Sequence, residues 1–426
     1  MKKMFLLLAF ALFFVFNLNA QESSSNDWKF SGASQIRAEL DGKDFSNKTY
    51  PLTYTSMRTR LALGKSLWDK VDFFVQIQDS RVLGETANTL KNMKNIDLHQ
   101  GYVQLNNLFA VPLSVQAGRF EMSYGTNHLF SANLWNYQGR SFDGLRFILK
   151  TEPMLLNVFS ITHTASSACL APVPSSYKYP AENDKGQSIY GFYASFPNFF
   201  EGNTIDFTAF YDQNSKRTDS IHKDLKRFTA GLTYYFDYND FSAIAEFDYQ
   251  FGEYKSLDVA AYLAFLSLQY KFDYLTVSAN LDMLSGTDPA ETEKFNSFET
   301  SYGAKHRYKG FMDYFGNAFL TANNLGLGNY YLSFLFKMKE KPISFQLDGH
   351  YFLTNKKNIN DLNDLGQEID FMIKYAFAKG TTIEWGASAF LQGDLMKELW
   401  NKDLSKDDFP RKDIAFWSYL MLRLNL

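Results

Sequence analysis

The sequence predicts an all-β protein, a transmembrane antiparallel β-barrel of about eighteen strands with short turns at one end and long loops at the other. Three observations support this fold class. The chain is rich in aromatic residues yet polar on average, it begins with a short apolar segment, and most of it alternates between apolar and polar residues. Such alternation is typical of strands whose two faces meet different environments.

Composition favours a membrane barrel over a helical membrane protein or an ordinary soluble enzyme. The 426 residues include 42 Phe and 26 Tyr, and aromatic residues make up 17% of the chain. The mean hydropathy is nevertheless −0.28, which is too polar for a bundle of membrane helices. Barrel strands face lipid on one side and water on the other, so the two contributions cancel in the average.

The N-terminal segment has the pattern of a cleaved secretory signal peptide. Two lysines precede an apolar run that ends at Leu18, and Ala20 offers a small residue for cleavage. The run is shorter than the roughly 17–25 residues of a membrane-spanning helix, which disfavours the alternative of an uncleaved anchor. We therefore expect residues 1–20 to be a signal peptide and residues 21–426 to form a barrel in the bacterial outer membrane.

Net charge excludes one class of partner. The signal peptide contains two of the 43 Lys and Arg residues, so the mature chain has 41 basic against 46 acidic residues, a net charge of −5. Nucleic-acid-binding proteins have basic patches and the opposite balance, so we expect membrane lipid and a polar solute as partners and no nucleic acid. The single cysteine, Cys169, has no second cysteine with which to form an internal disulfide.

Period-two alternation marks the strands. Between residues 227 and 252, Phe228 and Leu232 share one parity, whereas Arg227 and Thr229 share the other. Comparable runs predict strands at 28–40, 53–67, 71–82, 98–105, 113–123, 142–149, 155–163, 188–195, 203–212, 226–238, 241–252, 257–270, 275–284, 330–339, 343–353, 367–377, 381–391 and 413–425.

The connections between these strands mostly alternate between short and long. Short turns are predicted at 68–70, 239–240 and 271–274, and long loops at 124–141 and 285–329. Outer-membrane barrels have tight periplasmic turns and longer extracellular loops, so this asymmetry also predicts the orientation of the chain. All ten prolines lie outside the predicted strands, as expected because a proline would remove a ladder hydrogen bond that lipid cannot replace.

The polar parity, which must face the lumen, has an uneven distribution of charge. Arginines gather on the first, second and last strands, which become neighbours when the barrel closes, and one more lies on the sixth strand: Arg37, Arg58, Arg60, Arg423 and Arg146. Acidic residues dominate elsewhere, with one lysine among them: Asp206, Glu246, Asp248, Asp282, Asp348, Glu368, Asp370 and Lys374. We interpret this as a basic wall facing an acidic wall across the path of a polar solute. The alternative is that these charges only hold water and pair with one another.

Three motifs break the alternation. Asp79 and Arg81 lie on the lipid parity of their strand, as do Arg119 and, after Gly139-Arg140-Ser141, Asp143. A β-bulge would turn these side chains inward, and we then expect them to line the channel. Alternatively, each lies above the membrane at the loop end of its strand.

Several short motifs, taken in order, resemble the alginate-export porin family. They are Arg58-Thr59-Arg60, Gln78-Asp79-Ser80-Arg81, Asp97–Val103, Gly118-Arg119, Gly139–Asp143, Asp282–Gly286, His306–Gly310 with Asp313-Tyr314, and Leu365–Asp370. The resemblance implies an eighteen-stranded barrel whose arginine-lined channel passes anionic polysaccharide outward. It implies lining roles for Arg58, Arg60, Arg81, Arg119, Arg140 and Arg146. It also implies that the 285–329 loop, with His306, Arg307 and Asp313, is a plug or gate.

Three classes of function fit these observations. The first is a channel for polar or anionic solutes, for example in the export or uptake of poly- or oligosaccharides. The second is a barrel-embedded hydrolase, and the third is a closed structural or adhesive barrel. The six histidines have no recognisable serine partner and no metal-ligand spacing, so we assign no catalytic residue, metal or cofactor. The sequence leaves the oligomeric state open.

Overall fold

A computed structural model describes most of the mature chain. The described ranges are 28–46, 49–84, 95–165, 186–215, 224–300, 302–304, 306–316, 324–403 and 412–426. The expected signal peptide, its cleavage site at Ala20 and Cys169 lie outside these ranges. Within the described ranges, no helix has the length and apolarity needed to cross a bilayer.

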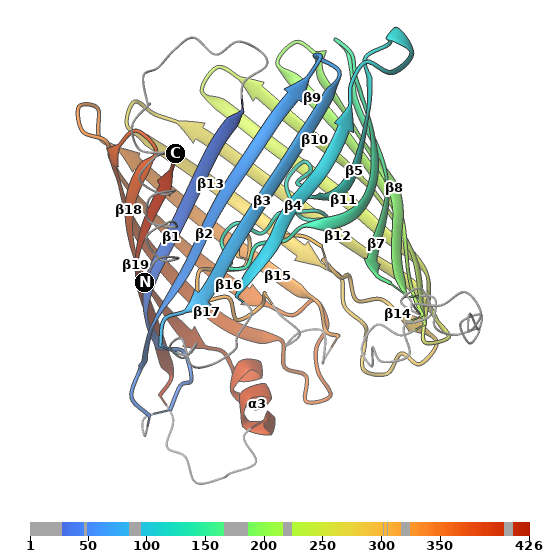
Figure 1. The fold of residues 1–426 in the computed structure, drawn as a ribbon. Coiled ribbons are helices and arrows are strands. Elements are labelled where there is room, and N and C mark those ends of the chain that lie inside the picture. Colours follow the sequence, from blue (N-terminus) through green and yellow to red (C-terminus); the bar gives the residue numbers. More distant parts are fainter. Residues whose placement is uncertain are drawn as a thin grey trace, which may run out of the picture.

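Eighteen long antiparallel strands form one closed barrel, as the sequence predicts (Figure 1). The barrel closes because β1 pairs with both β2 and β19. A short strand, β14 (Lys294–Phe295), adds to β12 at one end. The long strands are β1 (Lys29–Gly42), β2 (Leu52–Leu67), β3 (Val71–Val82), β4 (Ile96–Leu105), β5 (Leu113–Phe120), β6 (Phe142–Lys150), β7 (Leu155–Thr164), β8 (Gln187–Phe200), β9 (Asn203–Asn214), β10 (Leu225–Tyr238), β11 (Phe241–Tyr254), β12 (Leu257–Lys271), β13 (Leu275–Leu284), β15 (Leu327–Lys337), β16 (Ile343–Leu353), β17 (Asp364–Ala378), β18 (Thr381–Gln392) and β19 (Ile414–Asn425).

The two ends of the barrel differ. The turns after β10, β12 and β17 lie at the upper end in Figure 1, where the turn residue Asn239 has a positive φ of 54°. The longer connections and a helix, α3 (Asp394–Asp403), lie at the lower end. Tight turns face the periplasm in outer-membrane barrels, so we assign the lower end as the extracellular one.

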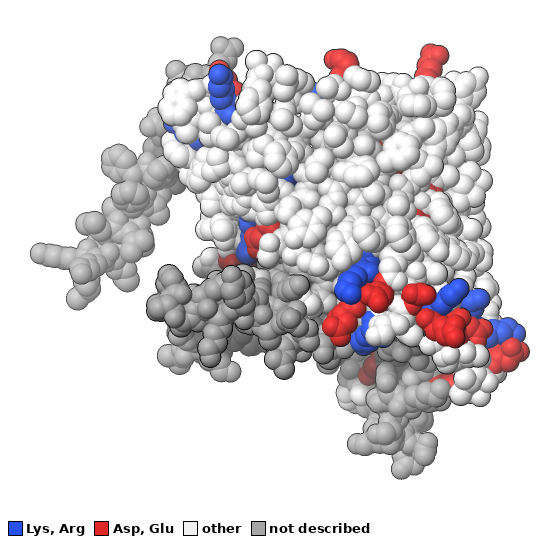
Figure 2. All heavy atoms as spheres, turned by 90° about the vertical axis from the view of Figure 1, so that its right-hand side faces the viewer, with Lys and Arg blue, Asp and Glu red and all other residues white. Residues whose placement is uncertain are grey.

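The outer wall is apolar. Phe247 on β11 and Leu332 on β15 are 54% and 50% exposed in the absence of lipid, and their neighbours in sequence point inward. Figure 2 shows a largely uncharged band around the middle of one side, with charged side chains gathered mainly at the extracellular rim. An apolar outer surface suits a lipid bilayer. The backbone groups of a closed barrel are paired within the sheet, so they need no partner from the lipid.

One proline departs from the expected pattern. Pro197 lies within β8, which is longer than the predicted strand at 188–195. The pairing of β8 with β9 is irregular there, because the register jumps between Phe196 and Phe200. A proline is tolerated at such a bulge because no ladder hydrogen bond is required from it.

The inner wall is less polar than the alternation alone indicates. Toward the extracellular end, inward positions hold buried aromatic and aliphatic side chains such as Phe142, Phe159, Ile189 and Phe352. Segments that follow β5 and β13 fold back into the lumen and pack against them. The expectation that polar residues face the lumen does not hold throughout this half of the barrel, because its inner face contacts protein.

A helix in the last long connection was not predicted from the sequence. Helix α3 packs beside β17, and its side chains Leu395, Met396 and Leu399 are buried. These residues follow the spacing of one helical face, but the preceding alternation on β18 obscured this short period-3.6 signal.

We expect Phe247→Arg to destabilise the barrel by about 2–4 kcal/mol, because it places a cation near the middle of the apolar band. The matched control is Tyr238→Arg on the adjacent strand β10, where Tyr238 is also outward but lies at the periplasmic end and is 67% exposed. At that position the expected loss of stability is only about 0–1 kcal/mol. Reversible unfolding in lipid vesicles measures both, and equal losses would contradict the assigned membrane position.

Candidate functional site

Two segments enter the lumen and form the candidate site. We call residues 121–141, between β5 and β6, the inner loop. We call the described residues between β13 and β15, which are 285–300, 302–304, 306–316 and 324–326, the gate loop. Phe130 of the inner loop is fully buried, and its ring lies 5.6 Å from that of Tyr302 of the gate loop. The two segments therefore contact each other as well as the barrel wall.

The basic wall holds the tip of the inner loop. Strand pairing places Gln35 between Arg58 and Arg423, which brings β1, β2 and β19 together as the sequence predicts. Arg58 Nη1 donates to the carbonyl of Asn136 at 2.7 Å. Arg37 Nη1 donates to the carbonyl of Trp135 at 3.2 Å, and its guanidinium lies 4.4 Å from the centre of the Trp135 ring. These arginines thus contact protein where we expected them to contact a solute.

The beginning of the inner loop is fixed by a carboxylate. Arg60 Nη1 and His99 Nε2 lie 2.9 Å and 2.8 Å from the same oxygen, Glu121 Oε1. Burial by itself raises the pKa of Glu121, but the hydrogen bond with His99 and the charge of Arg60 outweigh it, so the pKa is lowered. Arg60 also donates from Nε to Gln78 at 2.7 Å.

Arg140 joins the two segments. Its Nη1 donates to the carbonyls of Tyr302 and Gly303, the second at 3.1 Å. Burial lowers the pKa of the Arg140 guanidinium. Arg146, in contrast, contacts the wall and the base of the inner loop: it donates to Gln116 at 2.6 Å and to the Tyr124 hydroxyl at 3.3 Å.

The acidic wall binds the inner loop through one histidine. His128 Nδ1 lies 2.6 Å from Glu246 Oε2, and His128 Nε2 lies 3.7 Å from Asp282. The ring of Tyr308, in the gate loop, stacks on that of His128 at 3.8 Å. Asp248 is buried two residues along from Glu246 on the same inward face. The wall of carboxylates therefore supports a histidine that lies between both inserted segments.

The gate loop is held by two acids of β17. The backbone N–H of Met312 donates to Glu368 at 2.8 Å, and that of Phe311 donates to Asp370 at 3.2 Å. Gly310 precedes them with a φ of 75°, and a Cβ there would lie 2.6 Å from the Glu368 carboxyl group. Only glycine allows the backbone to approach the carboxylate this closely.

The predicted gate residues are close together. His306 Nδ1 lies 3.0 Å from Asp313 Oδ1, and its ring stacks on Trp135 of the inner loop at 3.8 Å. Arg307 is exposed within the lumen, where it lies over the ring of Tyr308 and lines a cavity together with Asp348. Lys374 also points inward, at a register position between Ser344 and Glu384.

Four predicted lining residues do not face the lumen. Arg119 on β5 lies 2.6 Å from Asp143 on β6, and Arg81 pairs with Asp79 on β3. Their neighbours Gln78, Gln116 and Phe142 are buried on the inner face, so these four side chains lie on the outer face. All four occur at the extracellular ends of their strands, which is the alternative that the sequence left open. The expectation that a bulge returns them to the channel is wrong, because the alternation continues through them.

Sequence reasoning did not include Arg227, which forms a buried ion cluster. Arg227 on β10 lies 2.8 Å from Asp212 on β9 and 3.1 Å from Glu299 of the gate loop. Its inward parity was visible in the sequence, so it could have been included with the lumen arginines. Its pairing with Glu299 could not have been predicted from the sequence, because that contact depends on the path of the gate loop.

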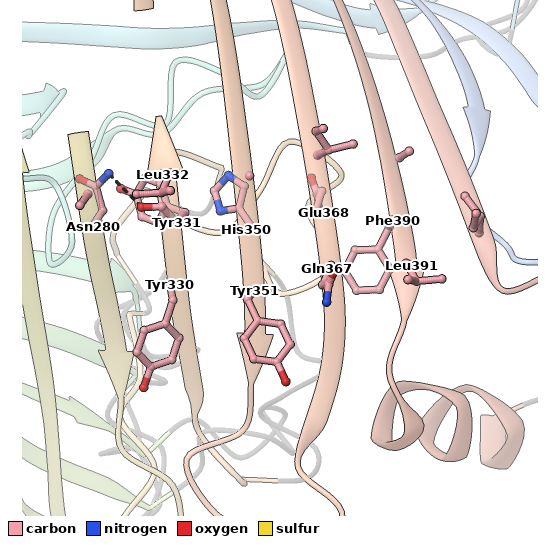
Figure 3. Close-up of a pocket in the computed structure, with 15 residues that line it drawn as sticks. Asn280, Tyr330, Tyr331, Leu332, His350, Tyr351, Gln367, Glu368, Phe390 and Leu391 are labelled. Carbon is pink, nitrogen blue, oxygen red and sulfur yellow. Dashed lines mark hydrogen bonds between the residues drawn. The ribbon is translucent and has the colours of Figure 1, made fainter. Parts of the chain in front are cut away.

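One hollow lies on the outer side of the barrel wall and is separate from the lumen. It measures about 710 Å³ and lies over Gly349, which pairs with Leu332 on one side. Figure 3 shows this wall, with Tyr330 and Tyr351 side by side on β15 and β16. Leu332 is half exposed on the outer face, so this surface faces the bilayer.

The closed barrel and its loop-filled, charged lumen define the class of outer-membrane porin-like proteins. Solved structures with the same fold include OccAB4 of Acinetobacter baumannii (TM-score 0.59, 10% identity, 96% of this chain and 100% of that chain covered). Others are OpdK of Pseudomonas aeruginosa (0.60, 8%, 93% and 99%) and a BenF-like porin of Pseudomonas fluorescens Pf-5 (0.59, 10%, 94% and 98%).

The family is shown by sequence. A family model described as alginate export matches residues 28–405, and the chain belongs to this family. A search of curated proteins finds no match. The protein is thus an outer-membrane β-barrel surrounded by lipid.

We expect Arg140→Ala to loosen the contact between the two inserted segments. It removes hydrogen bonds from a charged donor, worth roughly 1.5–3 kcal/mol each. Amide hydrogen exchange in residues 302–304 should accelerate by at least about tenfold. The control is Arg119→Ala, which removes an arginine from the outer face and should leave this exchange unchanged. An equal acceleration in both variants would contradict the role of Arg140.

The lowered pKa of Glu121 predicts acid sensitivity of the inner loop. A carboxyl group with a depressed pKa stabilises the docked loop above its ordinary titration range, and this stabilisation is lost as pH falls through the lowered pKa. The fluorescence of Trp135, isolated by difference from Trp135→Phe, should change across that range. The change should be absent in Glu121→Gln, and its persistence there would exclude Glu121 as the source.

Proposed function

We propose that this protein is a gated outer-membrane channel for polar solutes, oligo- and polysaccharides included, and that the arrangement described here is its closed state. One observation carries the proposal: the charged walls of the lumen contact the two inserted loops through hydrogen bonds, with no covalent link. Arg58 and Arg37 bind carbonyls of the inner loop, and Glu368 and Asp370 bind amides of the gate loop.

Such contacts support a gate because a polar solute offers the same kinds of groups. Hydroxyl and carboxylate groups accept hydrogen bonds from arginine, as the loop carbonyls do, and hydroxyl groups donate to carboxylates, as the loop amides do. A solute that enters the lumen can therefore exchange with a loop at modest net free energy. The bore of an eighteen-stranded barrel is wide enough for an aqueous path once the loops are displaced.

A closed structural barrel is the second candidate, and one specific observation favours it. Phe130, Tyr302 and Phe315 fill the extracellular half of the lumen and are at most 4% exposed. Apolar packing of this kind stabilises a plug without any need for it to move. The two candidates differ in whether loosening the loops opens a path for ions.

We favour transport over catalysis. His99, His128 and His306 each pair with a carboxylate at a point where a loop is docked. These contacts give the three histidines a positioning role in loop docking.

Planar-bilayer recordings distinguish the candidates. We expect low conductance for the wild-type protein and at least about tenfold higher open probability for Glu368→Ala combined with Asp370→Ala, because these substitutions remove the acceptors of the gate-loop amides. The control, Asp79→Asn combined with Asp143→Asn, neutralises two acids of the outer face and should behave as wild type. If the lumen variant stays silent, and deletion of residues 306–316 does too, the barrel is a closed one and the channel proposal fails.

A further inference from the structure

A second feature of the lumen lies on the periplasmic side of the gate loop. A cavity of about 280 Å³ is roofed by Arg307, Tyr308 and Phe311 and walled by β11, β12, β13, β15 and β16. A smaller cavity of about 150 Å³ shares Ile244, Ser267 and Gln269 with it and extends to the residues beside the β10–β11 turn. We call the two together the vestibule. The larger cavity alone approaches the lower end of the range of small-molecule sites, roughly 300–1,000 Å³, and the two together fall within it.

Uncharged hydrogen-bonding groups dominate the lining of the vestibule. Six inward side chains are amides or hydroxyls: Ser267, Gln269, Ser278, Asn280, Ser333 and Gln346. Asn280 Nδ2 donates to Ser278 Oγ at 3.1 Å, and this bond fixes the positions of the two side chains. Amides and hydroxyls both donate and accept, so they suit a ligand whose groups do the same.

Aromatic rings supply the apolar part of the same cavity. Phe265, Tyr308, Phe311 and Tyr331 line it alongside the polar groups. Tyr308 and Phe265 pack edge to face, with ring centres 5.2 Å apart, and this fixes their positions. Apolar rings with a few directed polar groups are the usual composition of a binding site, and a sugar ring presents both a C–H face and a belt of hydroxyls.

The vestibule has no excess of positive charge. Arg307 and Asp348 line the larger cavity, and Asp237 lines the smaller one. Asp348 Oδ2 accepts from Gln346 at 2.7 Å, and Oδ1 has no hydrogen-bond partner among the described residues. A polyanion needs several free cations to bind it. The lumen arginines do not supply them here, because they lie outside the vestibule and contact the inner loop, the gate loop or the wall: Arg37, Arg58, Arg60 and Arg140.

We propose that the vestibule binds a neutral polyhydroxylated solute, a segment of an uncharged oligosaccharide, from the periplasmic side. This inference rests on the proposed channel function and names the solute class that its inner mouth selects. Hydroxyls of the solute bond to the amide and hydroxyl side chains, and its ring faces lie against Tyr331 and Phe311. The unpaired oxygen of Asp348 accepts one further hydroxyl.

Isothermal titration calorimetry on the full mature protein in detergent tests this proposal, with maltohexaose as the neutral probe and a uronate hexasaccharide as the anionic one. We expect the neutral probe to bind at least tenfold more tightly than the anionic one. Asn280→Ala combined with Gln346→Ala should weaken neutral binding by at least tenfold. The matched control, Gln76→Ala combined with Gln104→Ala, removes two bonded amides from β3 and β4 and should bind as wild type.

Tighter binding of the uronate, absence of heat with the neutral probe, or equal weakening in the control would each overturn the assignment. Tyr331→Phe, which keeps the ring, should retain binding, whereas Tyr331→Ala should lose it, and this pair remains informative if the double variant folds poorly. Bilayer conductance of the same preparations separates the two proposals. A protein that conducts without binding the neutral probe disproves this inference alone, and one whose loop variants never conduct disproves the channel.

Discussion

Every polar group of the backbone must find a partner inside the bilayer, and the rest of this structure depends on that constraint. A sheet meets it only by closing on itself, which the pairing of β1 with β19 achieves. Closure with eighteen strands, however, leaves a bore too wide for the wall side chains alone to fill. The chain fills the extracellular half with two of its own loops. The inner surface is consequently aromatic where it contacts these loops and rich in amides and hydroxyls below them.

The two loops that occupy the lumen also explain the arrangement of its charged residues. A hydrated charge in a wide pore costs little, but a charge covered by a loop needs a partner. Arg227 meets this need with Asp212 and Glu299, and His128 meets it with Glu246. The basic and acidic walls therefore act as two docking surfaces, one mainly for carbonyls and the other for amides and a histidine. Opposite charges on opposite walls let two loops of different chemistry occupy one bore.

Much of the fold could be predicted from the sequence, because period-two alternation is a local signal. It placed all the long strands, and closure of the barrel then brought Arg37, Arg58 and Arg423 together. Parity alone could not decide the position of Arg119, since a bulge and a rim position give the same pattern. Contacts such as that between Arg140 and Tyr302 were beyond reach, because they depend on how a loop turns back through space. Pro197 shows the same limit, since only the pairing with β9 reveals the bulge that accommodates it.

The position of Trp135 links loop docking to assembly. Its ring lies 5.3 Å from Tyr419 on the last strand and beneath Arg37 on the first, and these two strands become neighbours only when the barrel closes. The site for this tryptophan therefore does not exist in a partly inserted sheet. It is completed by the final strand pairing, so the bore can be sealed only after the wall is whole. During biogenesis, Trp135 therefore docks only after the barrel has closed, at the last stage of folding.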